Sequence, residues 1–375
     1  MNLFQRYTFG QVRTPFLATI GALSALAVLT QSLSNLDLVA EDGGTAFALF
    51  QITLLAMPQV IALLLPIAVF LATAIAMNRM VSDSELTVGA AAGLSRRERL
   101  SPFLRLALYA MLINLVINLF VQPASFREMR EILYEIRTDV AASFMREGEF
   151  VRLGENVTFY TREISEGGVM YDVFIEDGRA DQAVAYSARR GVVARSQTGP
   201  VMLLEDGVRT ELDPQGALAQ LTFSSTEFDL SVFIDSASAF AFKESDKYLP
   251  ELLQPSAADV ARARSRDDLY AEGHYRISSP LYNLAFALMA AAAFLAVEHR
   301  RTGYTRFVII AGASALILRL AGFAVQAAAA SDSALNPLQY ALPLAGCAAG
   351  LYLIARPGLK QRLTQRLRRR KAAPA

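Results

Sequence analysis

The sequence has little of the chemistry that disulfides, metal sites and phosphate loops require. Its 375 residues include one cysteine, Cys347, and two histidines, His274 and His299. One cysteine cannot form an internal disulfide, and two histidines beside different apolar segments argue against a His/Cys metal site. No lysine follows a glycine, which excludes the GxxxxGK[ST] phosphate loop. The apolar segments also lack the paired carboxylates or nucleophile of an intramembrane enzyme. We therefore expect no catalytic residues, no cofactor and no metal in this chain.

The apolar residues are clustered, because 53% hydrophobic residues coexist with 19% charged residues. Both ends of the chain carry runs of roughly 20 apolar residues, the length that crosses a bilayer as a helix. The middle of the chain has none. The pattern predicts a membrane α-helical bundle of six transmembrane helices in a 3+3 arrangement, with an inserted antiparallel β-sandwich or β-jellyroll domain. The predicted spans are 14–36, 52–78, 101–123, 278–298, 304–329 and 337–355.

The distribution of basic residues predicts the orientation of these spans. The short loops 37–50 and 331–336 contain no lysine or arginine. The alternate connections are basic, which is the positive-inside pattern and places both termini in the cytoplasm and the middle domain outside. The basic residues on the inner side include Arg6, Arg13, Arg79, Arg96, Arg97, Arg99, Arg300, Arg301, Arg306 and those of the tail KQRLTQRLRRRK. Such a tail is more typical of an anionic membrane surface than of a nucleic-acid site.

The middle of the chain changes from a helical period to a period of two. The charged stretch FREMREILYEIRTDVAASFMREGEF predicts a helix along the membrane surface. The segments ENVTFYTREI, MYDVFIEDG, AVAYSARRGVVARS, GPVMLLEDGVRTEL and ALAQLTFSSTEFDL predict antiparallel strands separated by turn residues. The predicted domains are 1–125 (first transmembrane half, with a cytosolic helix at about 82–97), 126–270 (β domain with helical linkers), 271–356 (second half) and 357–375 (basic tail).

The stretch after the second span reads as a cytosolic helix suited to a partner. Ser82 and Glu85 have the spacing of a capping box at its start. Glu85 has the simpler alternative role of starting the helix. The run GAAAG that follows, residues 89–93, gives the helix little side-chain bulk, which lets a partner's cleft approach closely. In that interpretation Asp83 and Glu85 contact basic groups of the partner.

Several segments resemble the LptF/LptG permease family over nearly the whole chain. They are LPIAVFLATAIAMNRMVSDSELTVGAAAGLS, QPASFREMR after the third span, and HYRISSP before the fourth. The wording SDSELTV…GLS and the turn REGEF favour the LptF branch, with the LptG branch as the alternative. The cytosolic helix matches the family's coupling helix, which implies Asp83, Glu85, Leu86, Ala91 and Gly93 as candidate ATPase contacts.

The resemblance implies a non-catalytic permease subunit of an ABC transporter in the Gram-negative inner membrane. The implied transporter extracts lipopolysaccharide from the outer leaflet and passes it to a periplasmic β-jellyroll bridge, for outer-membrane biogenesis. The implied partners are an LptG-like permease, an LptB-like ATPase dimer that binds ATP and Mg²⁺, and an LptC-like protein. The family's lateral gates correspond here to 16–33 and 308–326.

Arg319 lies deep in the fifth predicted span, where an arginine costs about 2.5–3.5 kcal/mol unless it snorkels, pairs or faces water. It either snorkels to the outer headgroups or binds a lipid A phosphate through its bidentate guanidinium. Family members use basic residues at the outer end of the first span for this purpose, but here that end reads LTQSLSNLD. Arg319 and Arg276 are therefore the lipid-binding candidates. Arg276 and His274 have a simpler alternative role as interfacial anchors before Pro280.

Two asparagines in the third span, Asn114 and Asn118, are expected to hydrogen-bond to a neighbouring helix. Pro58 and Pro66 are expected to bend the second span. Two rival functions remain. One is a receptor or scaffold whose external β domain senses a ligand, and the other is an ABC permease for lipoproteins or cell-wall hydrolases.

Overall fold

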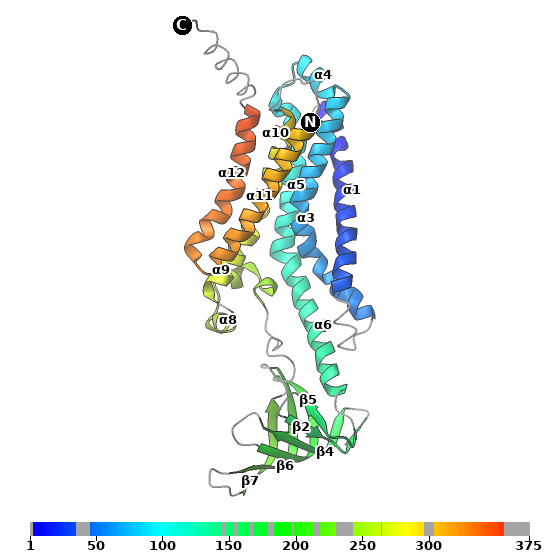
Figure 1. Ribbon diagram of the computed structural model, residues 1–375, viewed down its shortest axis with the longest axis vertical. Helices are drawn as coiled ribbons and strands as arrows, with labels where there is room; N and C mark the ends of the chain where they lie inside the picture. Colours follow the sequence, from blue (N-terminus) through cyan, green and yellow to red (C-terminus); the bar gives the residue numbers. More distant parts are fainter. Residues whose placement is uncertain are drawn as a thin grey trace, which may run out of the picture. The chain divides into compact units, whose positions relative to one another are not determined.

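The computed structural model describes residues 3–34, 46–143, 147–153, 157–165, 168–178, 184–196, 199–212, 218–229, 243–263, 265–295 and 304–355. The predicted tail 357–375 lies outside these residues. The chain divides into two compact units (Figure 1). The helical unit comprises Met1–Leu33, Thr53–Arg127 and Lys243–Ala375, and the β unit comprises Ser34–Ile52 and Glu128–Phe242.

Long apolar helices dominate the helical unit. Within the described residues, five helices are long and apolar enough to cross a membrane, and a sixth span results if α9 and α10, bent by 46°, count as one. These helices confirm the predicted membrane helical bundle. The long helices are α1 (Leu3–Ser34), α3 (Ala46–Ser82), α5 (Arg96–Val116), α6 (Gln122–Ser143), α9 (Arg266–Ser278), α10 (Leu281–Leu295), α11 (Thr305–Ala329) and α12 (Asn336–Ala355). The short ones are α4 (Glu85–Ala91), α7 (Leu249–Leu253), α8 (Ala257–Arg262), the π-helical turn η1 (Ile117–Val121) and the 3₁₀ turns η3 (Glu244–Asp246) and η4 (Ser333–Leu335).

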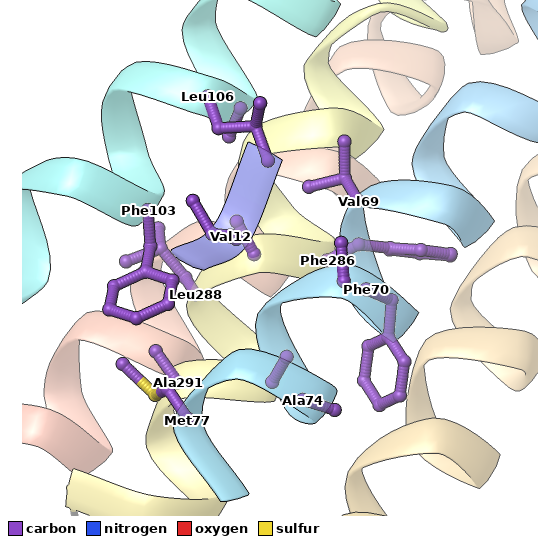
Figure 2. Packing of buried hydrophobic residues seen from close by; sticks show 14 of the residues in the cluster. Val12, Val69, Phe70, Ala74, Met77, Phe103, Leu106, Phe286, Leu288 and Ala291 are labelled. Atoms are coloured by element: carbon purple, nitrogen blue, oxygen red, sulfur yellow. The ribbon is translucent and has the colours of Figure 1, made fainter. Parts of the chain in front are cut away.

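The helix α10 is the centre of the helical unit, since it is buried on almost every side. Its sequence, LYNLAFALMAAAAFL, is apolar all round, as expected for a helix enclosed by others. Figure 2 shows Phe286, Leu288 and Ala291 of α10 packed with side chains from α1, α3 and α5, among them Val12 and Phe103. The alanines keep the neighbouring helices close.

A pair of glycines in α12 lets it approach α10 closely. Gly346 and Gly350 lie four residues apart in the sequence GCAAG, the spacing of small residues at helix contacts in membranes. A Cβ atom added to Gly350 would lie 2.8 Å from the Leu288 Cβ and 3.0 Å from its carbonyl carbon. Any larger residue would therefore separate the two helices.

Asn114 and Asn118 replace hydrogen-bond donors that two prolines lack. In a helix the N–H of residue i bonds to the carbonyl of residue i−4, and proline has no N–H. Pro66 therefore leaves the Ala62 carbonyl without its donor, and Asn114 Nδ2 donates to that oxygen at 2.9 Å. Pro280 follows the end of α9 at Ser278 and likewise offers no N–H to the Arg276 carbonyl, to which Asn118 Nδ2 donates at 3.2 Å.

These contacts confirm the predicted interhelical role of both asparagines, which are buried. Asn118 also donates to Ser279 Oγ at 2.9 Å, at the break between α9 and α10. It belongs to the π turn η1, whose extra residue changes the direction of the side chains that follow. The helix α3 continues through both Pro58 and Pro66 without a break.

The β unit contains one antiparallel sheet. Its strands are β1 (Val151–Leu153), β2 (Val157–Tyr160), β3 (Glu163–Ile164), β4 (Val169–Asp177), β5 (Val184–Ser196), β6 (Gly199–Leu212) and β7 (Leu218–Asp229). The order is β1-β2-β4-β5-β6-β7, and β3 also pairs with β4. From β4 to β7 each described strand pairs with the next one in the sequence, whereas β2 pairs with β4 and not with β3.

Alternate residues of the strands form the apolar core of this unit. Val157 and Phe159, Val173 and Ile175, and Met202 and Leu204 are all buried on one face, as the period of two predicts. The antiparallel β domain is thus confirmed. Among the described strands, hydrogen bonds join all seven into one sheet. The predicted surface helix falls on α6, which continues from α5 through η1 without a gap, and its position along a membrane surface stays a prediction.

Candidate coupling helix and buried arginines

The short helix α4 lies between α3 and α5, at the end of the helical unit where α1 begins (Figure 1). The predicted capping box of Ser82 and Glu85 is wrong. The helix α3 extends through Ser82, whose hydroxyl donates back to the Asn78 carbonyl at 3.0 Å. Ser84 occupies the N-cap position of α4 in a left-handed conformation with φ 57°, and its side chain makes no capping hydrogen bond. A true capping box forms further on, between Ser95 and Glu98 at the start of α5.

The inner face of α4 is held against α1 and α5. Glu85 accepts a hydrogen bond from the Tyr7 hydroxyl of α1 at 2.8 Å. Leu86 is buried, and its carbonyl accepts from Arg99 Nη1 of α5 at 3.3 Å. Gly89 is also buried, and a Cβ atom there would touch Phe4 of α1 at 3.5 Å. Side chains from two long helices therefore fix the orientation of α4.

The outer face of α4 is small and apolar. Thr87, Ala90 and Ala91 are exposed, and the Val88 side chain is 65% exposed. Gly93 ends the helix with φ +85°, a conformation that glycine adopts without strain. The amides of Gly93 and Leu94 close the end by donating to the Ala90 and Gly89 carbonyls. The result is a helix end that presents almost no side-chain bulk.

The five predicted contact residues thus divide into two groups. Asp83, Ala91 and Gly93 are exposed, with Asp83 in a loose ion pair with Arg79 at 3.7 Å. Glu85 and Leu86 face inward and hold α4 in place. Sequence reasoning missed Val88 and Tyr7. The helical period would have found Val88, which lies three residues before Ala91 on the face opposite Leu86 and Gly89.

Arg319 of α11 is buried under aromatic rings. Its side chain lies over the rings of Phe323, Tyr282 and Tyr275 at 4.6, 4.7 and 5.7 Å. Nη2 donates to the Tyr275 hydroxyl at 3.0 Å, whereas Nε and Nη1 have no hydrogen-bond partner among the described residues. The Tyr282 hydroxyl beside it is likewise buried and unpaired there. Cation–π contacts therefore compensate part of the cost of this charge, and two of the three guanidinium nitrogens have no partner among the described residues.

Arg276 of α9 is occupied by the protein itself. It is 1% exposed and donates to three backbone carbonyls and to Glu272. His274 contacts the Tyr340 hydroxyl through Nδ1 at 3.0 Å. Both residues thus stabilise the entry to the α9–α10 span.

The predicted gate segments carry exposed apolar side chains. In α1, Leu26, Leu29 and Leu33 are more than 60% exposed, and in α11, Ile309 and Ile317 are more than 60% exposed. Within the described residues, no group of three His, Cys, Asp or Glu side chains lies close enough to hold a metal ion.

Together, the membrane-length helices and the β sheet that the sequence inserts between them define a polytopic membrane protein with an inserted β domain. The family model described as "Lipopolysaccharide export system permease LptF/LptG" matches residues 6–356. The chain therefore belongs to the LptF/LptG family. Members of this family are inner-membrane permeases of lipopolysaccharide export, and membership indicates a transporter subunit and not an enzyme.

Individual relatives agree with this assignment. An uncharacterised protein of Rickettsia prowazekii is 26% identical over 358 residues, which cover 94% of this chain and 99% of that protein. The lipopolysaccharide export system permease protein LptF of Escherichia coli K12 is 25% identical over 283 residues, covering 74% of this chain and 73% of that protein. LptF of Shigella flexneri matches to the same extent.

Proposed function

We propose that this chain is the LptF-type permease subunit of an ABC transporter. In this proposal the transporter extracts lipopolysaccharide from the outer leaflet of the inner membrane and passes it to a periplasmic β-jellyroll bridge. The family match supports the transport function, and the E. coli relative named LptF supports the branch. The LptG branch is the alternative. Pairing with an LptG-like paralogue would complete the permease.

We further propose the 3+3 arrangement of spans, with both termini cytoplasmic and the β domain periplasmic. The distribution of arginines supports this topology. The proposed parts are residues 1–125, 126–270, 271–356 and 357–375. An LptC-like protein would add a strand to the edge strand β7, whose twelve residues pair only with β6 among the described strands.

The observation that carries the proposal is the two-sided character of α4. Its inner face is fixed by Tyr7 and Arg99, while its outer face exposes Val88 among small residues. A groove of an LptB-like ATPase would accept Val88, Ala91 and the helix end at Gly93, with Asp83 at the rim. Glu85 and Leu86 would act from the inner side by holding the helix. ATP and Mg²⁺ would bind in the ATPase and not in this chain.

Arg319 is the proposed lipid-binding residue. Its Nε and Nη1 have no partner among the described residues, and each could donate one hydrogen bond to a phosphate oxygen. Arg276 is the weaker candidate, since its donors are already used by protein oxygens. Entry of a phosphate requires the rings over Arg319 to move aside, so binding would accompany a movement of α11.

Co-purification with the ATPase tests the role of α4. We expect Val88→Asp to lose at least tenfold of the co-purified ATPase, because a buried carboxylate in an apolar groove is costly. Val88→Ile is the matched control and should retain it. Undiminished binding by Val88→Asp would show that α4 does not contact the ATPase. Depletion of the chain should also cause lipopolysaccharide to accumulate in the inner membrane.

Photocrosslinking to lipopolysaccharide tests Arg319. We expect Arg319→Ala to reduce the crosslinked fraction severalfold, whereas Arg319→Lys should retain part of it because the charge remains. Equal crosslinking by wild type and Arg319→Ala would exclude phosphate binding by this residue.

A further inference from the structure

Arg276 binds the segment through which the chain returns to the helical unit. The strand β7 ends at Asp229, and the described chain resumes at Lys243. Arg276 Nη1 donates to the Lys247 carbonyl at 2.6 Å, and Nη2 donates to the Glu244 and Ser245 carbonyls at 3.0 and 2.8 Å. One buried guanidinium therefore binds three carbonyls of a single turn.

Arg127, which precedes the β strands in the sequence, binds the same segment. It lies in α6, and its Nε donates to the Asp246 carbonyl at 2.9 Å. Its Nη2 pairs with Glu251, and its guanidinium lies 4.4 Å from the centre of the Tyr248 ring. Four consecutive carbonyls, from residue 244 to residue 247, thus accept hydrogen bonds from arginines. Arg127 lies in α6, before the β strands, and Arg276 lies in α9, after them.

The same segment also has hydrogen bonds and an ion pair of its own. The buried Asp246 carboxylate accepts hydrogen bonds from the Lys243 amide at 2.9 Å and from Ser245 Oγ at 2.8 Å. Lys247 is buried and pairs with Asp259 at 2.9 Å. Hydrogen bonds from Ser256 and from Lys247 lower the pKa of Asp259 to about 2. A connecting segment that served only as a tether would not need so many directed contacts.

The Glu272 carboxylate links Arg276 to α11. Glu272 Oε1 accepts from Arg276 Nε at 2.9 Å, and its Oε2 accepts from Gln326 Nε2 of α11 at 3.2 Å. Because Glu272 lies one helical turn before Arg276, this one side chain contacts both Arg276 and α11.

We propose that residues Lys243–Glu251 form an arginine-held joint that makes the chain's exit from the helical unit follow the movement of the membrane helices. Arg276 and Arg127 are the positioning residues of this joint. The inference rests on the proposed function for its use, because a permease that hands lipid onward must coordinate its membrane helices with its external domain. Arginine suits the role, since its guanidinium presents five N–H donors in a fixed planar fork, whereas lysine presents three from a single nitrogen.

The lysines of the chain provide a direct test. The sequence has only four, Lys243, Lys247, Lys360 and Lys371, so lysyl endopeptidase has two sites in the joint and two in the tail. In the assembled transporter, cleavage after the buried Lys247 should be slow. We expect Arg276→Gln to accelerate it at least tenfold. Arg162→Gln is the control, because it removes an exposed arginine of the β unit that pairs with Asp172.

A second readout separates positioning from simple structural support. Reconstituted transporter carrying Arg127→Gln, which alters the joint at a residue that is not a lipid-binding candidate, should keep its ATP hydrolysis rate within about twofold and lose at least tenfold of the lipopolysaccharide released per ATP. Arg276→Lys retains the pair with Glu272, so its rate of cleavage at Lys247 should lie between those of wild type and Arg276→Gln. It replaces Arg276→Gln if that variant does not assemble. Unchanged cleavage at Lys247 would overturn the joint, and accelerated cleavage with unchanged release per ATP would overturn its coupling role. Failure of the wild-type transporter to release lipid would instead refute the proposed function.

Discussion

The pairing of asparagines with prolines makes a prediction with its own internal control. If Asn114 supplies the donor that Pro66 lacks, Pro66→Ala should partly rescue Asn114→Leu by restoring a backbone N–H to the Ala62 carbonyl. In the same way Pro280→Ala should rescue Asn118→Leu. The crossed combinations, Asn114→Leu with Pro280→Ala and Asn118→Leu with Pro66→Ala, restore the wrong donor and should show no rescue.

The expected magnitudes follow from the burial of these groups. Both asparagines are at most 3% exposed, so each leucine variant leaves a carbonyl without a donor where water is scarce. An unsatisfied buried group costs about 1–3 kcal/mol in soluble proteins. Hydrogen bonds between membrane helices average about 0.6 kcal/mol, with a maximum near 1.7. We expect a loss of about 1–2 kcal/mol for each leucine variant, and a coupling energy of about 1 kcal/mol in each matched pair.

The single cysteine of the chain provides the assay. Cys347 lies in α12 and is partly buried, so a thiol-reactive dye reports the unfolding of the helical unit on heating. For a chain of this length, 1 kcal/mol corresponds to roughly 1–2 °C in the midpoint. The matched pairs should recover about half of the lost midpoint. Equal recovery in matched and crossed pairs, or none in either, would refute the replacement of proline donors by asparagine.

Three further variants test other parts of the structure. Gly350→Ala should lower the same midpoint by a few degrees by forcing α12 away from α10, at a cost of about 1–3 kcal/mol. Gly10→Ala has open space around it and should cause no loss. Gly93→Ala should weaken α4 by about 1–2 kcal/mol through its positive φ alone, seen as faster amide exchange in α4, and Gly93→Asn should do so less. The Asp259 pKa of about 2 lies below its ordinary value of 3.8, so its stabilisation is present above pH 3.8 and is lost as the pH falls toward 2. Asp259→Asn should therefore lower the midpoint at pH 6, and its difference from wild type should vanish near pH 2.

The parts of the fold that were predictable from the sequence are those set by local patterns. Apolar runs predicted the membrane helices, and the period of two predicted the antiparallel strands. The polarity of Asn114 and Asn118 within an apolar helix predicted bonds to another helix. That these bonds replace proline donors was predictable in principle from Pro66 and Pro280, but only if the facing helices were known.

The remaining features depend on contacts between distant residues. The capping box failed because α3 continues through Ser82, and packing decides where a helix stops as much as the cap does. The Tyr7–Glu85 contact joins residues 78 positions apart, and no local pattern indicates it. Arg276 looked like an interfacial anchor or a phosphate ligand, yet its partners are backbone carbonyls about 30 residues earlier. Every residue has a backbone carbonyl, so the sequence does not indicate which carbonyls a side chain will bind.

The length of α4 has a mechanical consequence. Seven residues are too few for an isolated helix to persist in water, so α4 exists only because the opening turns of α1 and the start of α5 support it. A protein that binds α4 therefore exerts force on α1 and α5 at once. Bending of α4 alone cannot accommodate a small displacement of α4. The first helix, whose remaining surface is mostly unburied by its neighbours, would then shift along with the third crossing of the bilayer.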